Sequence, residues 1–136
     1  MSLLTQQLVV AYRRQRELYA QVLELVGRQK RIMETSPDPG AVLGLCRQVE
    51  TLMGQIAVIE DAVLPAKDEW GRTREDPGGE LNEELKSVEA AIEQIGRMQQ
   101  FVQDRLLDYM RGQQERADGT RTAIRINRAN RLYRAG

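Results

Sequence analysis

Apolar residues recur every three or four positions over three long stretches of the chain. In the first stretch, near residues 3–35, one stripe of apolar positions comprises Leu4, Leu8, Tyr12, Tyr19, Val22, Val26 and Met33. Charged residues such as Arg13, Glu17 and Arg28 occupy the opposite side. This spacing matches the 3.6-residue period of an amphipathic helix and not the two-residue period of a strand.

The second stretch has the most regular pattern. Its apolar positions alternate steps of three and four without a break: Val42, Leu45, Val49, Leu52, Ile56, Ile59, Val63, Ala66 and Trp70. Such a seam lets helices pack at a shallow angle along their length. Pro65 lies inside the seam, and proline removes an amide donor and disfavours helix at the residue before it. We therefore expect a kink or an early helix end near Pro65.

The third stretch begins at Glu80 and widens toward its C-terminal half. Its regular positions are Leu81, Leu85, Val88, Ile92, Ile95, Gln99, Val102, Leu106 and Tyr109, and Met98, Phe101, Leu107 and Met110 broaden the stripe. A broad stripe needs more than one covering surface. Two interpretations stay open: the other two helices cover it, or a partner outside the chain does.

Proline, glycine and aspartate cluster at residues 36–40 and 75–79, which is the chemistry of turns. Short connections join antiparallel neighbours. The pattern predicts an all-α fold of three long antiparallel helices, a helical hairpin or coiled-coil-like bundle, at roughly 2–34, 41–70 and 80–115. Residues 1–115 form the predicted bundle domain, and residues 116–136 form a flexible Arg-rich tail.

The charge of the chain changes sign near residue 111. Residues 80–110 hold seven acids and three bases, a net charge of −4, whereas residues 111–136 hold seven arginines and two acids, a net charge of +5. The tail has only isolated apolar residues, too few to build a core of its own. We expect it to be weakly helical or disordered, and to order on a partner.

The amino-acid composition of the chain excludes several classes of enzyme. The chain has no histidine, which excludes Ser-His-Asp and Cys-His catalysis and zinc sites with histidine ligands. Cys46 is the single cysteine, so the chain forms no internal disulfide, and a lone thiol suits a reducing compartment. Adjacent carboxylates such as Glu60 and Asp61 point about 100° apart on a helix and do not share a site. We predict no enzymatic activity and no catalytic residues, cofactor or metal.

The charge of the chain and its N-terminal sequence limit the classes of partner that we expect. Twenty basic residues balance twenty acidic ones, so the formal net charge is zero. The tail arginines follow an acidic helix and are accompanied by one aromatic residue, which argues against a nucleic-acid partner. The N-terminal apolar patch is short and has no basic residues before it, so no membrane insertion is expected and a cytoplasmic location is predicted.

Three features together resemble the FlgN family of flagellar type III export chaperones. They are the Leu-Tyr-x-x-x-Leu-x-Leu run from Leu18 to Leu25, the helix from Ile92 to Tyr109, and the terminal residues 132–136. The resemblance implies a cytosolic, non-enzymatic chaperone that keeps hook-associated proteins of the hook–filament junction soluble and delivers them to the export apparatus.

The C-terminal third is the predicted client site, because it holds the widened stripe and the apolar points of the tail. The predicted partner-binding residues are Phe101, Leu106, Tyr109, Met110, Ile124, Ile126, Leu132 and Tyr133. The alternative function is a structural coiled-coil module that oligomerises through the seam at residues 42–70. A monomer or a weak homodimer fits the chaperone interpretation, and a stable higher oligomer fits the structural one.

Overall fold

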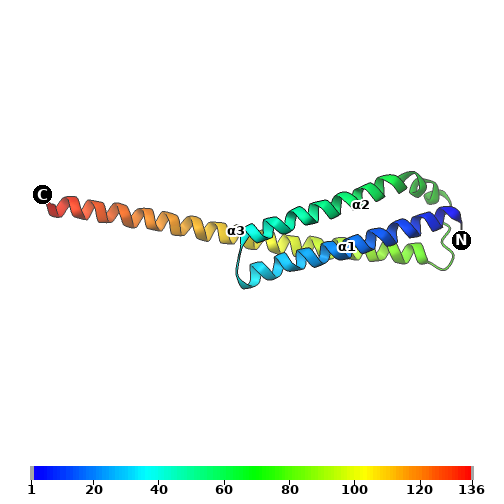
Figure 1. Ribbon diagram of the computed structural model, residues 1–136, viewed down its shortest axis with the longest axis horizontal. Helices are drawn as coiled ribbons and strands as arrows, with labels where there is room; N and C mark the ends of the chain where they lie inside the picture. Colours follow the sequence, from blue (N-terminus) through cyan, green and yellow to red (C-terminus); the bar gives the residue numbers. More distant parts are fainter. Residues whose placement is uncertain (1, 136) are drawn as a thin grey trace. The chain divides into compact units, whose positions relative to one another are not determined.

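The protein is all-α. The computed structural model describes the backbone of residues 2–135 and the side chains of residues 2–121. Helix α1 spans Leu3–Thr35, α2 spans Pro39–Thr73 and α3 spans Glu80–Ala135 (Figure 1), and the described residues contain no strand. The chain divides into two compact units, Met1–Val102 and Gln103–Gly136. The first unit therefore contains α1, α2 and the first part of α3, packed as antiparallel neighbours as the pattern predicts.

The first two helices begin at the residues that the sequence favours. The Ser2 hydroxyl oxygen accepts a hydrogen bond from the Thr5 amide at 3.1 Å and caps α1. Asp38 Oδ1 accepts one from the Ala41 amide at 3.2 Å, and Pro39 occupies the first turn of α2, where no amide donor is required. Both helix starts lie within two residues of the predicted ones.

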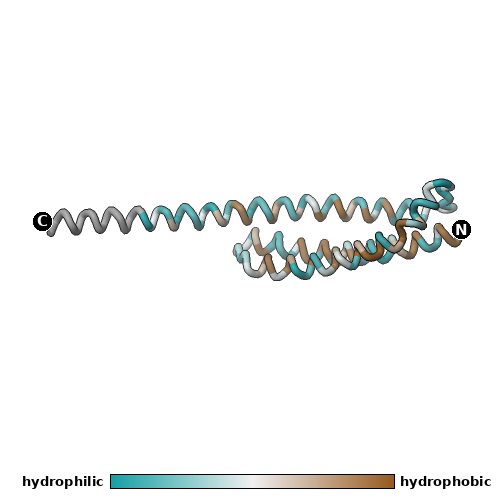
Figure 2. Tube along the Cα trace, turned by 90° about the horizontal axis from the view of Figure 1, so that it is seen from above, coloured by the Kyte–Doolittle hydropathy of each residue, from teal (hydrophilic) through white to brown (hydrophobic). Residues whose placement is uncertain are grey.

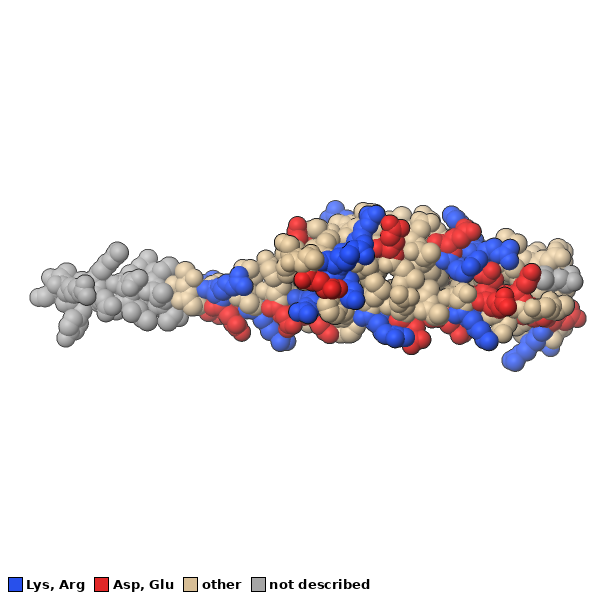
Figure 3. All heavy atoms as spheres, turned by 90° about the horizontal axis from the view of Figure 1, so that it is seen from below, with Lys and Arg blue, Asp and Glu red and all other residues tan. Residues whose placement is uncertain are grey.

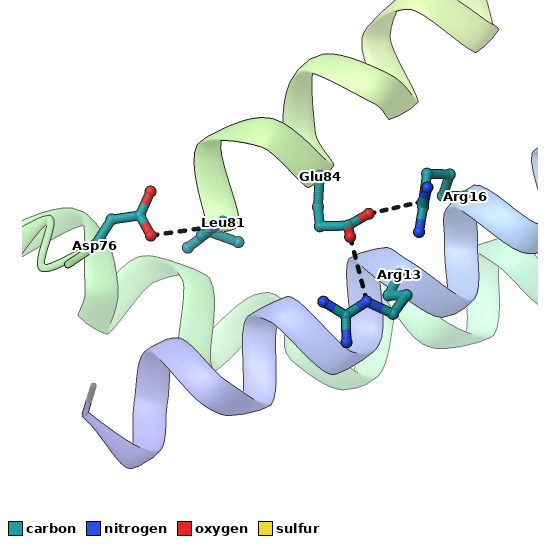
Figure 4. A network of polar contacts seen from close by, with 5 residues as sticks. All are labelled: Arg13, Arg16, Asp76, Leu81 and Glu84. Carbon is teal, nitrogen blue, oxygen red and sulfur yellow. Dashed lines mark hydrogen bonds and ion pairs between the residues drawn. The ribbon is translucent and has the colours of Figure 1, made fainter. Parts of the chain in front are cut away.

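The connection between α2 and α3 is held by backbone and side-chain hydrogen bonds. Arg74 ends α2 in the left-handed region at φ 52°, and its amide donates to the Trp70 carbonyl at 2.7 Å. The Asp76 carboxylate then accepts a hydrogen bond from the Leu81 amide at 3.0 Å (Figure 4) and another from the Asn82 amide at 2.9 Å. These bonds satisfy donors that the first turn of α3 leaves unpaired.

One carbonyl ties this connection to the other helices. The Glu75 carbonyl oxygen accepts hydrogen bonds from Thr5 Oγ1 of α1 at 2.7 Å and from Trp70 Nε1 of α2 at 2.9 Å. The loop is thereby fixed against the start of α1 and the end of α2.

Helix α1 supplies most of the core. The buried apolar side chains that form the main cluster are Leu8, Val9, Tyr12, Leu18, Tyr19, Val22, Leu25, Val26, Val49, Ile56, Leu81, Val88 and Ile95. Eight of these thirteen belong to α1, so α1 is covered by both other helices. Hydrophobic and hydrophilic positions alternate along α1, α2 and the coloured part of α3 (Figure 2), as expected for helices that each turn a polar side to water.

Pro65 does not end α2, which continues to Thr73. Of the two outcomes expected there, an early helix end is wrong. Figure 1 shows that the last turns of α2 bend from the line of the rest of the helix. The cause is that a proline cannot donate to the carbonyl four residues earlier, and its ring crowds that carbonyl.

Helix α3 does not end near residue 115, as predicted, but runs to Ala135. No proline interrupts the chain after residue 112, and arginine, alanine and leucine favour helix. Contacts one turn apart support the helix within the second unit: the Thr120 hydroxyl donates to the Arg116 carbonyl at 2.9 Å, and Arg121 Nη1 lies 3.8 Å from Asp118 Oδ1. Of the two states expected for the tail, weakly helical or disordered, the structure shows a helix.

A buried carboxylate joins α3 to α1. Glu84 is 9% exposed, and its Oε1 accepts a hydrogen bond from Arg13 Nε at 3.2 Å (Figure 4). Arg16 Nε lies 2.9 Å from Oε2, an ion pair whose angle falls outside hydrogen-bond geometry. Both guanidinium groups remain half-exposed to water. Glu84 is thus a buried acid near the N-terminus of α3 with two basic partners on α1.

Two leucines test how much the core contributes to stability. Leu18 is 1% exposed and Leu43 is 57% exposed. We expect Leu18→Ala to lower the free energy of unfolding by about 2–5 kcal/mol, because it leaves a cavity in the core. Leu43→Ala, the matched control, should change it by less than about 0.5 kcal/mol. Urea denaturation followed by circular dichroism measures both values, and equal losses would show that α1 is not central to the core.

Candidate functional site

The apolar stripe on the second half of α3 is partly exposed. Phe101 lies in the first unit, half-buried, and Lys30 Nζ of α1 is 5.4 Å from the centroid of its ring. Leu106 and Tyr109 lie in the second unit and are also half-buried, whereas Met110 is 61% exposed. The neighbouring Leu107 is 46% exposed. The stripe therefore presents aliphatic and thioether side chains to solvent.

Four further predicted binding residues cannot be placed. The side chains of Ile124, Ile126, Leu132 and Tyr133 lie outside the described residues, although the backbone there is part of α3. Their assignment to the client site stays a prediction.

Helix α2 is also more apolar than its buried area requires. Leu43, Val58 and Leu64 on α2 are 57%, 68% and 48% exposed. In the part of the chain that the structure describes, α2 is the one helix long and apolar enough to cross a membrane by length and composition alone. Only 17% of its most apolar window is buried.

Two connected hollows lie between α2 and α3 over a floor formed by α1. The first, about 270 Å³, is lined by Tyr19, Met53, Ile92, Ile95, Gly96 and Gln99. The second, about 230 Å³, is lined by Tyr12, Gln15, Tyr19, Ile56, Glu60, Lys67, Leu85, Val88, Glu89 and Ile92. The two share Tyr19 and Ile92, and we call them together the α2–α3 groove. A larger hollow of about 430 Å³ between α1 and α2 is lined mostly by polar residues.

Glu60 organises the polar end of the α2–α3 groove. Its carboxylate accepts hydrogen bonds from Gln15 Nε2 at 2.9 Å, Lys67 Nζ at 3.1 Å and Tyr12 Oη at 3.3 Å. Lys67 Nζ also lies 5.5 Å from the centroid of the Tyr12 ring, within range of a cation–π interaction. One carboxylate thus links α2 to two residues on α1.

This cluster shifts the pKa of its members. Burial by itself raises the pKa of Glu60, but the hydrogen bonds from Gln15, Lys67 and Tyr12 and the charge of Lys67 outweigh burial and lower that pKa below 4.5. The Tyr12 side chain and Glu60 favour charged Lys67 and raise its pKa. Burial, joined by the nearby Glu60 charge, raises the pKa of Tyr12. At neutral pH the cluster therefore holds a paired carboxylate and ammonium.

Cys46 lies half-buried on α2, with its Sγ 3.1 Å from Gln29 Nε2. Gln29 Nε2 also donates to the Val42 carbonyl at 3.0 Å. Within residues 2–121, no group of three or more histidine, cysteine, aspartate or glutamate side chains is placed to hold a metal ion. The arrangement around Cys46 is a packing contact between α1 and α2.

Charges of both signs are interspersed over the described surface. The face in Figure 3 shows blue and red side chains alternating along the helices, with neither sign gathered into one large patch. Several are paired one turn apart, such as Arg97 and Glu93 at 2.6 Å and Arg28 and Glu24 at 3.1 Å. Exposed pairs of this kind add little stability and supply no strong steering field.

The α2–α3 groove is the surface that the sequence pattern did not reveal. The heptad seam places Ile92 among buried positions, yet it is 48% exposed, and Met53, which lies outside the seam, lines the groove. The sequence does contain a signal for this exposed apolar surface, because Leu43, Met53 and Leu64 form a second set of apolar residues beside the seam. Only the packing of three helices shows that nothing in the described part of the chain covers it.

Comparison of the chain with protein-family models, with curated proteins and with solved structures finds no match.

The Glu60 cluster makes a pH-dependent contribution to stability. Because the pKa of Glu60 is lower in the folded than in the unfolded chain, its stabilising effect is present above the unfolded value and disappears as pH falls through the folded value. We expect Glu60→Gln to lower the melting temperature at neutral pH, and the difference from the parent protein to shrink below pH 4.5.

The matched control is Glu69→Gln, which removes an exposed acid of α2 that forms no ion pair among the described residues. Its effect should be small and should not follow the pH profile of the Glu60 variant. A pH-independent loss in Glu60→Gln would mean that the cluster stabilises by packing and not by charge.

Proposed function

We propose that this protein is a non-enzymatic cytoplasmic chaperone that binds amphipathic helices of client proteins. By its resemblance to the FlgN family, the clients are hook-associated proteins of the flagellar hook–filament junction, and the chaperone hands them to the export apparatus. The observation that carries the proposal is the exposed apolar stripe on the second half of α3, above all Met110 at 61% and Leu107 at 46% exposed.

The chemistry of this stripe suits a chaperone. Methionine and leucine side chains adapt to partners of different shape, and an apolar helix face binds the apolar face of another amphipathic helix. Binding of this kind requires no catalytic group. The basic residues that follow, with a net charge of +5 over residues 111–136, would speed association with an acidic client.

Two point variants test the client site without disturbing the core. Leu107→Gln and Met110→Gln replace exposed apolar side chains by a good helix former, so the melting temperature should stay unchanged. Each should weaken the binding of a purified hook-associated protein by about tenfold or more. Val10→Gln is the matched control, because Val10 is an equally exposed apolar residue on α1, at 66%.

Deletion of residues 117–136 tests the rest of the predicted site. The described side chains from 117 to 121 are exposed, so the melting temperature should change little. The helix content should fall in proportion to the residues removed, because α3 extends to Ala135. Calorimetric titration with the same client should show weaker binding. Full affinity in the truncated protein and in both point variants would contradict the proposed site.

The competing function, oligomerisation through the seam of α2, has no such support. Seam residues Val42, Val49 and Ile56 are buried at 2%, 7% and 4% exposure within a single chain. The seam is therefore used to pack α2 against the other helices of the same molecule. A coiled coil with another chain would first have to expose it.

A further inference from the structure

We propose that the α2–α3 groove is a second binding site, which takes one amphipathic helix of a partner protein with a basic polar face. All of the residues that line the groove lie in the first unit. The bound helix would complete a four-helix arrangement with α1, α2 and α3.

The groove has the dimensions of a helix-binding site. Its lining on α3 extends from Leu85 to Gln99, which corresponds to about 21 Å at 1.5 Å per residue. That length accommodates about four turns of a partner helix. The centre is apolar: Met53 and Ile92 are 40% and 48% exposed on its two walls, and Tyr19 lies between them on the floor. Aliphatic residues at i, i+3, i+4 and i+7 would fill such a groove.

Gly96 leaves part of the groove open. It lies on α3 beside Ile92 and Ile95, and a Cβ atom added there would meet no heavy atom within 4 Å. A glycine in the middle of an exposed helix costs about 1 kcal/mol relative to alanine. The missing side chain lets a partner helix approach closely.

The helix segments that border the groove carry more acids than bases. Residues 50–68 of α2 and 85–99 of α3 contain six acids and three bases, a net charge of −3. Lys67 is paired with Glu60, and Arg97 with Glu93. Of the two acids that line the groove, Glu60 is paired with Lys67, and Glu89 forms no ion pair within the described residues. Lysine or arginine beside the apolar stripe of a partner helix would meet Glu89 and the net negative charge of these segments, whereas an acidic helix would be repelled.

A synthetic peptide tests the site directly with the full-length protein. The probe has about 14 residues, with leucines at i, i+3, i+4 and i+7 and lysines at the other positions, and its counterpart has glutamate in place of lysine. We expect the lysine peptide to bind about tenfold or more tightly than the glutamate peptide, and its affinity to fall as salt is raised. Fluorescence anisotropy of labelled peptides measures both.

Matched glycine variants locate the binding. Gly96→Arg places a long cationic side chain in the groove, and Gly44→Arg makes the same change at an exposed position of α2 that also has open space around it. Both variants should fold with unchanged or raised melting temperature. Gly96→Arg should weaken the binding of the lysine peptide by about tenfold, and Gly44→Arg should leave that binding unchanged.

Each other outcome overturns the inference. Equal binding of the two peptides, or equal effects of the two glycine variants, would show that the groove is not the binding site. If the unliganded protein forms a dimer that Gly96→Arg dissociates and Gly44→Arg does not, a second copy of the chain fills the groove instead. Because no flagellar protein is used, failure here leaves the proposed client site on α3 untouched.

Discussion

The fold depends on one constraint, which is that the buried positions of α1 are spread over too much of its surface to be covered by a single neighbour. Its buried positions, from Leu8 to Met33, include Val22 and Val26 at 0% exposure and occur on the sides facing both α2 and α3. Burial of apolar area is the main favourable term in folding, and it has no direction of its own. A helix with a wide apolar surface therefore recruits two partners, and the turns at residues 36–38 and 74–79 allow α2 and α3 to lie against it.

The same arrangement leaves α2 and α3 each half-covered. Three helices in mutual contact bury one side of each outer helix, whereas both outer helices here carry apolar residues beyond that side. Val42, Val49 and Ile56 are buried on α2, but Met53 and Val58 are not. The exposed remainder, together with Ile92 on α3, forms the α2–α3 groove. Contiguous apolar surface exposed to water is a common feature of binding sites.

Polar contacts fix the register of the helices on α1. Glu84 of α3 lies against Arg13 and Arg16, and Glu60 of α2 accepts from Tyr12 and Gln15 (Figure 4 shows the first). Each carboxylate has one geometry in which its partners are reached, and a slip of one turn would leave the buried Glu84 without them. Such contacts contribute little net stability when their partners are half-exposed to water. Their effect is to favour one alignment among several that apolar packing alone would accept.

The sequence was sufficient to predict the three helices and the residues at which the first two begin. The reason is that the apolar periodicity, the Ser2 and Asp38 caps and the turn residues each act over only a few positions of the chain. These local features did not predict the end of α3, where good helix formers continue the helix past residue 115. They also could not show which seam residues stay exposed: Ile92 has the same spacing as the buried Val88 and Ile95. Exposure depends on how many helices lie around a position, and that number is a property of the whole assembly of helices. The sequence by itself determined three amphipathic helices, and only the tertiary structure decided that a groove remains between α2 and α3.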